Sequence, residues 1–447
     1  MKKKGKRLAA LAVSFLVGLL LTGCMMTSSA EELYVLPKLP EEYQSLRARI
    51  QTILADGAEY AAPTAGTNLQ SVQLVDLDGD GEEEALAFFR NSSTEKPLKI
   101  YVFRAKGGVY EELAIIEGSG TAINSVRYVD MDADGCREIL VSWRVSAEVQ
   151  AMAVYAMEDL SSPLMASAYA RYDVVDLDND QILELIVLRS DGTESGGSVA
   201  DYYDWIGQTL IQQSAAKLSM TVAELQWMQA GTLRDGCPAI FVTGVEAEAR
   251  TITDILVYKE PELVNIVLNS ATGASSEIFR NLSLQPSDIN TDGVTEVPMP
   301  AELIPDGEES YWKVYWRSYN SSGAAEMEAV TYHNSADSWY LLLPREWDGH
   351  FAVRQKNISA AERATTFYSL RGRQLGEELF TIYTLTGANR ENLAAGSSRE
   401  ILRRQPSGAV YAVTYYDTYP DWRYAVSKEE LAGRFNAIVT QWTTGDN

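Results

Sequence analysis

The sequence feature that most constrains the fold is an aspartate-rich segment that recurs along the first two thirds of the chain. Copies occupy residues 75–84, 129–138, 175–184 and 288–296. Their first aspartates, at positions 76, 130, 176 and 288, are 54, 46 and 112 residues apart. The last interval is twice the usual period, which predicts a degenerate copy near residue 231. Residues 231–240 keep the Asp-Gly pair and the apolar run after it, so the chain contains a repeat of about fifty residues.

Each copy lies between apolar segments that are typical of β-strands. Strand-like runs follow the copies at residues 85–89, 139–143, 185–188 and 240–243. In the first unit two further candidates, 98–104 and 110–116, flank the turn at Lys106-Gly107-Gly108. Four short strands in each repeat predict a mainly β fold, a β-propeller of about five or more four-stranded blades. We place these blades at residues 66–338, and the sequence leaves open how the ring closes.

The acidic residues fall at alternate positions of each copy, counted from its first aspartate as position one. Ca²⁺ takes 6–8 oxygen ligands at roughly 2.3–2.6 Å, whereas Mg²⁺ demands stricter octahedral geometry. Side chains at positions one, three, five and nine can converge on one ion, and position seven can supply its backbone carbonyl. We therefore predict up to four Ca²⁺ sites, with these ligands: Asp76, Asp78, Asp80, Glu82 and Glu84; Asp130, Asp132, Asp134, Cys136 and Glu138; Asp176, Asp178, Asp180, Ile182 and Glu184; Asp288, Asn290, Asp292, Val294 and Glu296.

This arrangement resembles the FG-GAP or VCBS-type repeats of integrin α-chains and of many bacterial surface proteins. The resemblance covers about 270 residues and implies a propeller in which calcium stabilises the loops. Gln181 departs from the pattern, because glycine is usual at position six. The degenerate copy should bind no ion. The alternative interpretation is that the acids only form solvated turns.

The N-terminus has the layout of an export signal. Five basic residues precede an apolar run at 8–21, which is too short to span a bilayer. Leu21-Thr22-Gly23-Cys24 resembles the lipobox of bacterial lipoproteins, which implies cleavage of a signal peptide at 1–23 and a palmitate-type lipid anchor on Cys24. An ordinary signal peptide with a chance cysteine, or an uncleaved anchor, is the alternative. Residues 24–65 are expected to form a tether and a short helix. The predicted location is the extracytoplasmic face of the cell membrane.

Charge and cysteine content limit the partners and the covalent framework. The chain carries a net charge of −24; residues 1–23 contribute +5 and residues 311–447 sum to zero, so residues 24–310 carry −29. Such an acidic region disfavours nucleic acid as a partner. After Cys24 only Cys136 and Cys237 remain. They fall at equivalent positions of non-adjacent repeats, and we expect both thiols to be unpaired.

The pattern changes after residue 338, and we predict a small α+β domain at 339–447. Capping signatures at Ser359 and Ser427 predict helices at 360–371 and 428–442. Strands are expected at 379–385 and 409–416. The tryptophans concentrated in this region are expected to fill a core rather than to form a sugar-binding platform. His333 and His350 have no spacing typical of a zinc site or a catalytic triad.

No catalytic motif is evident, although paired carboxylates for glycoside chemistry depend on three-dimensional spacing. The leading hypothesis is a membrane-anchored cell-surface lipoprotein that binds a protein or glycan through a calcium-stabilised propeller. The alternatives are a lyase or hydrolase of extracellular polysaccharide, which would use carboxylates of the propeller face, and a structural partner of an envelope complex. A cleft with two buried acids of raised pKa would favour the enzyme.

Overall fold

The structure is a computed structural model that describes residues 43–193, 196–246, 250–275, 278–280, 284–303, 312–372, 374–396, 398–405 and 408–438. The predicted signal peptide, Cys24 and the first part of the tether lie outside these residues. The described chain begins with helix α2 (Gln44–Ala55), which buries Leu46 and Ile50 against the first sheet. In this part of the chain no helix has both the length and the apolar character that a bilayer crossing requires.

In the described residues six antiparallel sheets of four or five strands follow one another along the chain, and a two-stranded sheet lies between the fourth and the fifth. The first sheet contains β1 (Glu59–Tyr60), β2 (Val72–Val75), β3 (Glu84–Arg90), β4 (Leu98–Lys106) and β5 (Val109–Gly118). The second sheet contains β6 (Ala122–Val129), β7 (Glu138–Arg144), β8 (Gln150–Tyr155) and β9 (Met165–Tyr169). The third sheet contains β10 (Arg171–Val175), β11 (Glu184–Ser190), β12 (Ser198–Ile206) and β13 (Thr209–Lys217).

The fourth, fifth and sixth sheets complete the described fold. The fourth sheet contains β14 (Leu225–Thr232), β15 (Pro238–Glu246), β16 (Arg250–Lys259), β17 (Glu262–Asn265) and β20 (Ile278–Arg280), and a small hairpin of β18 (Leu268–Asn269) and β19 (Ala274–Ser275) follows β17. The fifth sheet contains β21 (Val297–Glu302), β22 (Trp312–Tyr319), β23 (Ala325–Asn334), β24 (Trp339–Leu343) and β30 (Phe435–Ala437). The sixth sheet contains β25 (Phe351–Ser359), β26 (Glu362–Arg371), β27 (Gln374–Leu385), β28 (Glu400–Arg404) and β29 (Val410–Tyr415).

The predicted strands of the repeat are confirmed. The four runs that follow the acidic segments lie within β3, β7, β11 and β15, whose residues are almost all buried. In the first sheet β4 and β5 form the expected hairpin, with Gly107 and Gly108 at φ of 61° and 77°. Such strands are buried on both faces because apolar side chains of neighbouring sheets pack against each other. One cluster joins the first and second sheets, another the second and third, and a third joins the third and fourth.

Main-chain hydrogen bonds connect neighbouring sheets at the loops that lead into β3, β7, β11, β15 and β21. We name these loops L1 (76–84), L2 (130–138), L3 (176–184), L4 (233–237) and L5 (288–296). Arg137 N of L2 donates to Leu77 O of L1 over 2.7 Å, and Leu183 N of L3 donates to Met131 O of L2 over 2.7 Å. Thr295 N of L5 likewise donates to Thr232 O, directly before L4. The loops therefore hold neighbouring sheets together.

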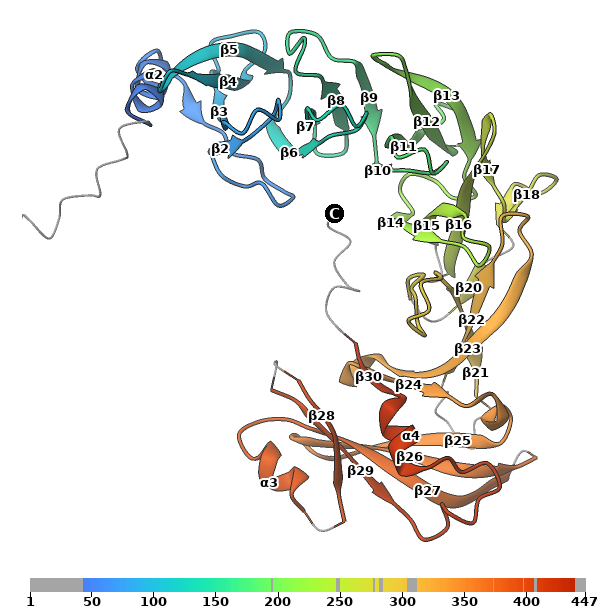
Figure 1. The fold of residues 1–447 in the computed structure, drawn as a ribbon. Helices are drawn as coiled ribbons and strands as arrows, with labels where there is room; N and C mark the ends of the chain where they lie inside the picture. Colours follow the sequence, from blue (N-terminus) through green and yellow to red (C-terminus); the bar gives the residue numbers. More distant parts are fainter. Residues whose placement is uncertain are drawn as a thin grey trace, which may run out of the picture.

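The sheets form an open arc (Figure 1). The first strands β2, β6, β10 and β14 lie on its concave side, and β5, β13 and β17 lie further out. Among the described elements no strand of the sixth sheet pairs with one of the first. The predicted mainly β fold of repeated small antiparallel sheets is confirmed, whereas the described sheets do not close into a propeller.

The helix predicted at 360–371 is wrong, because residues 362–371 form strand β26. The Ser359 and Glu362 pattern is a purely local signal. Thr365, Thr366 and Phe367 favour extended backbone, and β26 pairs with β25 and β27 on its two sides. Glu362 forms an ion pair with Arg399 instead of capping a helix. The long-range pairing outweighs the capping signal.

The helix predicted at 428–442 begins as expected and ends early. Ser427 accepts a hydrogen bond from Glu430 N over 3.1 Å at the start of α4 (Lys428–Gly433). Phe435 begins β30, which adds a fifth strand to the edge of β24. Because β24 also pairs with β23, the expected domain division between residues 338 and 339 crosses the fifth sheet. The predicted strands at 379–385 and 409–416 correspond to β27 and β29, and α3 (Arg390–Ala394) joins β27 to β28.

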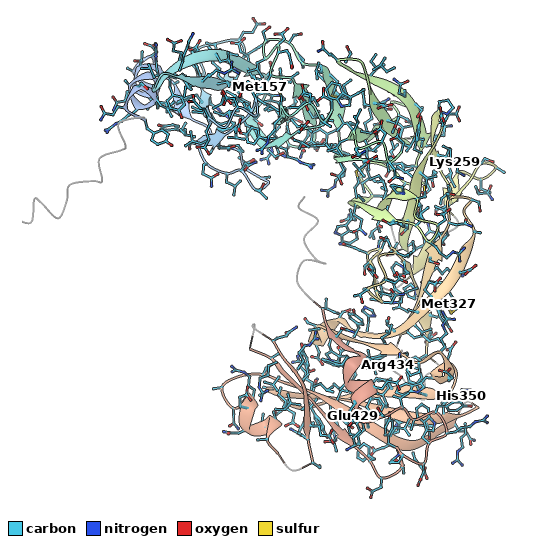
Figure 2. The ribbon with its side chains drawn as sticks, in the orientation of Figure 1. Met157, Lys259, Met327, His350, Glu429 and Arg434 are labelled. Atoms are coloured by element: carbon cyan, nitrogen blue, oxygen red, sulfur yellow. The ribbon has the colours of Figure 1, made fainter. Side chains whose placement is uncertain are left out.

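The aromatic residues that form the core cluster of the described C-terminal region are buried, as expected. Trp339 and Trp347 are fully buried between the fifth and sixth sheets. His333 is buried and its ring stacks on Tyr340 at 5.0 Å. His350 lies beside the start of β25 (Figure 2). Its ring stacks on that of Tyr424 at 4.3 Å. Neither histidine belongs to a group of potential metal ligands in the described residues.

Candidate metal centres

The acidic loops L1, L2, L3 and L5 share one pattern of hydrogen bonds. The position-five carboxylate accepts a bond from the backbone N–H of position seven, over 2.7–2.8 Å in every loop. The position-one carboxylate accepts from the N–H of position six over 2.8–3.2 Å. These bonds are Asx-type turns that hold each loop in a tight coil. Ligand atoms of three or four acidic side chains in each of these loops lie within 4.8 Å of one another.

The position-nine glutamate closes each loop from within the core. Glu84, Glu138, Glu184 and Glu296 are at most 2% exposed. One oxygen of each accepts the backbone N–H of position two, over 3.0, 2.8, 2.6 and 3.0 Å in chain order. The position-two side chains are apolar and buried, which fixes the loop to the core: Leu77, Met131, Leu177 and Ile289. The second oxygen of Glu184 and that of Glu296 have no hydrogen-bond partner, whereas that of Glu84 contacts Arg104.

Several carboxylate oxygens in these loops are buried and lack a hydrogen-bond partner. They are Oε1 of Glu184, Oε1 of Glu296 and Oδ1 of Asp130. A buried charge without a partner costs free energy unless a counter-charge is supplied. These oxygens fit the requirement of Ca²⁺, a hard cation that binds carboxylates. The donor set is therefore compatible with a bound calcium ion in L2, L3 and L5.

Burial sets the protonation of the position-nine glutamates in the protein without metal. Desolvation raises the pKa of Glu138 to about 7, that of Glu184 to about 8 and that of Glu296 to about 7. The backbone N–H bonds lower these pKa values, and the neighbouring aspartates raise them again. A bound divalent cation favours the ionised form and reverses the shift.

L1 differs because it already contains a cation. Arg104, on β4, reaches Asp78 Oδ2 with NH2 at 2.7 Å and Glu84 Oε1 with Nε at 3.3 Å. The corresponding position on β12 is Asp204, whose charge raises the pKa of Glu184 in L3. The acidic motif alone does not indicate this difference between L1 and L3, because the partner comes from a strand outside the motif. The structure shows that their electrostatic environments are opposite.

L3 has the most complete set of candidate ligands although it lacks the usual glycine. Atoms of Asp176, Asp178, Asp180 and Glu184 all lie within 4.8 Å of one another. Gln181 adopts the left-handed conformation, with φ of 76°, and its N–H donates to Asp176 Oδ2 over 3.1 Å. The loop geometry therefore matches that of Gly81 in L1, at the cost of backbone strain.

In the other three loops the structure brings together part of each predicted set. The groups are Asp76, Asp78 and Glu84; Asp130, Asp132 and Glu138; and Asp288, Asp292 and Glu296. In L5, Asn290 donates to Asp292 Oδ2 over 2.8 Å. The position-seven carbonyls of Glu82, Cys136, Ile182 and Val294 stay predictions.

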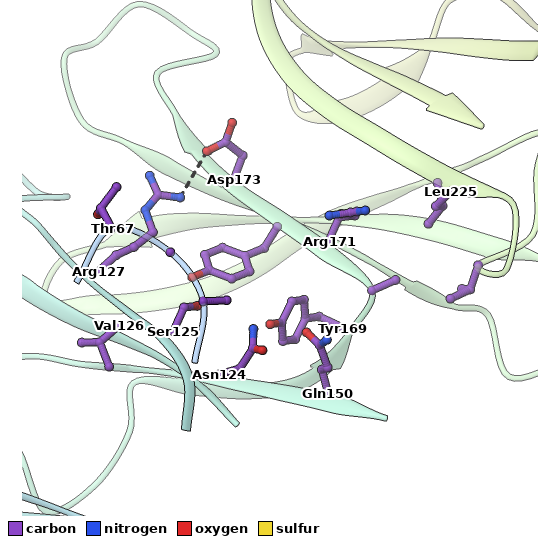
Figure 3. A pocket seen from close by; sticks show the side chains of 15 residues that line it. Thr67, Asn124, Ser125, Val126, Arg127, Gln150, Tyr169, Arg171, Asp173 and Leu225 are labelled. Carbon is purple, nitrogen blue, oxygen red and sulfur yellow. Dashed lines mark hydrogen bonds and ion pairs between the residues drawn. The ribbon is translucent and has the colours of Figure 1, made fainter. Parts of the chain in front are cut away.

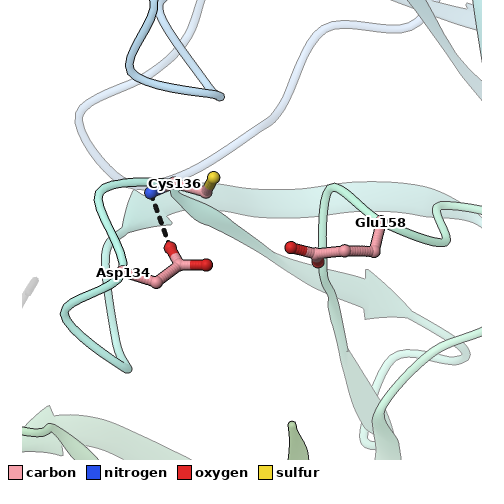
Figure 4. Close-up of side chains that lie close together, drawn as sticks. All are labelled: Asp134, Cys136 and Glu158. Atoms are coloured by element: carbon pink, nitrogen blue, oxygen red, sulfur yellow. Dashed lines mark hydrogen bonds between the residues drawn. The ribbon is translucent and has the colours of Figure 1, made fainter.

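Cys136 of L2 lies beside L1, with its Sγ 3.8 Å from Asp78 O, and belongs to a separate group of side chains. Ligand atoms of Asp134, Cys136 and Glu158 lie within 4.8 Å of one another (Figure 4). Burial raises the pKa of the Cys136 thiol to about 11, and Asp134 adds to the shift. Both Cys136 and Cys237 are free thiols, which confirms the prediction that they are unpaired.

In the degenerate loop L4 a backbone carbonyl accepts the hydrogen bond that a glutamate carboxylate accepts in the other loops. It is three residues shorter, because Thr232 pairs with Pro238 as Val75 pairs with Glu84. Leu233 N donates to Cys237 O over 2.8 Å instead of to a glutamate. Asp235 accepts bonds from N and Oγ of Ser321 at 2.9 and 2.7 Å. This loop has neither the length nor the free carboxylates of the others.

A groove on the concave side of the arc is the second candidate site. One part of it is a cavity of about 540 Å³ between β6, β10 and the start of β14. Figure 3 shows Asn124, Gln150 and Tyr169 gathered on one side and Arg127 bonded to Asp173 on the other. A neighbouring cavity of about 690 Å³ between β2 and β6 shares Thr67 and Arg127 with it. We call the two cavities the concave groove.

No known protein family and no curated protein matches the chain. Solved structures with partial likeness include a protein from Lactobacillus plantarum, with 12% identity, a TM-score of 0.24 and coverage of 70% of this chain and 85% of that chain. A GDP-Man-dependent mannosyltransferase from Leishmania mexicana has 10% identity and a TM-score of 0.18, covering 74% and 92%. An endo-arabinase from Bacteroides thetaiotaomicron has 12% identity and a TM-score of 0.22, covering 74% and 98%. At these TM-scores the likenesses carry no argument about fold or function.

Proposed function

We propose that this chain is a lipid-anchored, extracytoplasmic binding protein whose repeated loops hold Ca²⁺. The observation that carries the calcium assignment is the set of buried carboxylate oxygens without partners in L2, L3 and L5. The anchor rests on the Leu21–Cys24 segment of the sequence. The propeller-type arrangement of blades, of the FG-GAP or VCBS kind, remains part of this proposal.

Calcium in these loops would stabilise the fold rather than take part in a reaction. Each loop leads into a strand of its own sheet, and main-chain hydrogen bonds at L1, L2, L3 and L5 join neighbouring sheets. A ligand that binds only the folded state stabilises it by about 2.7 kcal/mol at one hundred times its Kd. Outside the cell calcium is abundant, so sites with Kd of roughly 10⁻⁴–10⁻³ M are sufficient.

The residues that line the concave groove favour a binding function over hydrolysis of a glycoside. Hydrolysis of a glycoside generally uses two carboxyl groups on either side of the scissile bond. Asp173 is the single carboxylate among the described residues that line the groove, and Arg127 pairs with it at 3.3 Å. The glutamates with raised pKa lie in the metal loops and not in the groove. A protein or glycan ligand is therefore favoured over a substrate that this chain cleaves.

Thermal unfolding with and without calcium tests the proposal, with Glu184→Gln as the informative variant. We expect millimolar CaCl₂ to raise the Tm of the wild type and EDTA to lower it. Glu184→Gln keeps an acceptor for Leu177 N but removes the carboxyl group, whose burial without a metal ion costs free energy whether it is ionised or has to take up a proton. It should therefore raise the Tm in EDTA, reduce the rise that calcium produces, and lower the number of ions bound in calorimetry.

Glu95→Gln is the matched control, because Glu95 is an exposed glutamate on the β3–β4 connection of the first sheet. We expect this variant to follow the wild type in both conditions. A wild-type Tm that is the same in calcium and in EDTA would show that the acids form ordinary turns and would end the calcium assignment.

A further inference from the structure

We propose that the concave groove binds an acidic oligosaccharide, through arginines that contact its carboxylates and tyrosines that contact its sugar rings. This inference rests on the proposed binding function and specifies its ligand class. The groove is formed by the first strands of the sheets, which lie along the concave side of the arc (Figure 1). Its two cavities meet at Thr67 and Arg127, so a chain of several sugar units can follow it.

The groove is locally basic within a strongly acidic region. Its lining contains three arginines, at 127, 137 and 171, and one acid, Asp173, which gives a formal charge of +2. The surrounding residues 24–310 carry −29. A cationic recess with acidic surroundings attracts a ligand whose negative charges fit within the recess. The guanidinium groups suit carboxylates because they can donate two parallel hydrogen bonds.

Aromatic rings lie beside these cations. The rings of Tyr169 and Tyr172 meet edge to face at 5.2 Å, and the Arg127 guanidinium lies 5.8 Å from the centre of the Tyr172 ring. Asn124 and Gln150 add amide groups to the same cavity. Sites for small ligands commonly combine aromatic walls with a few placed polar groups. Here the amides suit sugar hydroxyls, and the tyrosine rings suit the apolar faces of the sugar.

The spacing of charge distinguishes a sugar chain from nucleic acid. A nucleic acid carries a phosphate on every unit, and its charges beyond the groove would face the acidic surface. An oligosaccharide with a carboxylate on alternate units places fewer charges there. Arg171 donates to Gln226 O over 2.9 Å, which holds its side chain across the β10 to β14 junction. The site is therefore partly organised before a ligand arrives.

Calorimetry with a defined probe tests the inference. The probe is a tetrasaccharide of alternating glucuronic acid and N-acetylglucosamine, titrated into the calcium-loaded mature protein. We expect binding that weakens with added salt and is lost when the carboxylates are converted to methyl esters. Arg127→Gln and Arg171→Gln should each raise Kd at least tenfold, or about 1.4 kcal/mol.

Arg403→Gln is the control, since Arg403 is an exposed arginine on β28 in the sixth sheet. Its Kd should stay within twofold of the wild type, and the Tm of every variant confirms folding. Equal binding of acid and ester, an unchanged Kd in Arg171→Gln, or tighter binding of a thymidine tetranucleotide or tetraglutamate would overturn the inference. Absence of sugar binding in a protein whose Tm still rises with calcium would refute the groove assignment and leave the calcium proposal intact.

Discussion

At the residue scale, the loops show how a side chain can depart from a pattern without changing the backbone. Gln181 was the one residue of L3 that argued against a metal loop, because a side chain at positive φ is costly. Its φ of 76° is nevertheless close to the 88° of Gly81 at the same position of L1. The hydrogen bond to the position-one aspartate is also the same. The loop conformation is imposed by the carboxylates and the buried glutamate, and Gln181 follows it.

Gln181→Gly should therefore stabilise the protein. We expect the free energy of unfolding to rise by about 1 kcal/mol, since relief of the left-handed strain exceeds the entropy that glycine adds to the unfolded chain. Urea unfolding followed by tryptophan fluorescence measures the change. The reverse substitution in L1, Gly81→Gln, should destabilise by a similar amount. A loss of stability in Gln181→Gly would mean that the side chain makes a contact that outweighs the strain.

His333 gives the fold a sensitivity to acid. Burial lowers its pKa to about 3, while Thr331 Oγ1 lies 2.9 Å from its Nδ1. In the unfolded chain the pKa is about 6.5. Between these values the unfolded state binds a proton that the folded state does not. Stability contributed by the neutral imidazole is therefore present above pH 6.5 and is lost as pH falls toward 3, by up to about 1.4 kcal/mol per pH unit.

His333→Phe keeps the ring stacking and removes the titration. The free energy of unfolding of this variant should fall less steeply than that of the wild type between pH 6.5 and pH 4.5. Urea unfolding at several pH values gives both slopes. Equal slopes would show that His333 is protonated in the folded protein, contrary to its burial.

At the scale of elements, the repeated unit was predictable because its signals are local and periodic. The strands around each loop alternate with turn residues, and the period of about fifty residues located the degenerate copy before any contact was known. Contacts that a loop makes with side chains of other strands were not predictable. Arg104 lies 20 residues after Glu84, and nothing in the motif indicates that β4 delivers a cation to L1. The strand at 362–371 was missed because pairing with two neighbouring strands overrode a capping signature.

Arg104→Gln should convert L1 into a stronger calcium site. Without calcium, loss of the guanidinium leaves Asp78 and Glu84 without their counter-charge, and the Tm should fall. With calcium the Tm should recover, and calorimetry should show tighter binding or one additional ion. Arg49→Gln, on the exposed face of α2, is the control and should alter neither quantity. An Arg104→Gln protein with the wild-type number and affinity of ions would mean that L1 is not a calcium site.

At the scale of the whole molecule, the sequence indicated the order of the sheets and not their closure. Composition and periodicity define each sheet, because its strands are adjacent in the chain. Whether the first sheet meets the last depends on contacts between residues hundreds of positions apart, and no repeat pattern encodes them. The fifth sheet illustrates the point, since β30 joins β24 from nearly one hundred residues away. The concave groove also arises only from the assembled arc, with lining residues drawn from four sheets.

The residue at position two of each loop connects the ion site to the next sheet. Leu77 donates its N–H to the buried glutamate of its own loop and accepts Arg137 N through its carbonyl, and Met131 repeats this arrangement toward L3. Loss of an ion from one loop would thus first weaken the hydrogen bonds between its sheet and the following sheet. The relay stops after L3, because the corresponding residue in the fourth sheet is Cys237, whose N–H bonds to the Asp235 carboxylate instead. A structural change transmitted through these hydrogen bonds along the first three sheets would end between the third and fourth sheets.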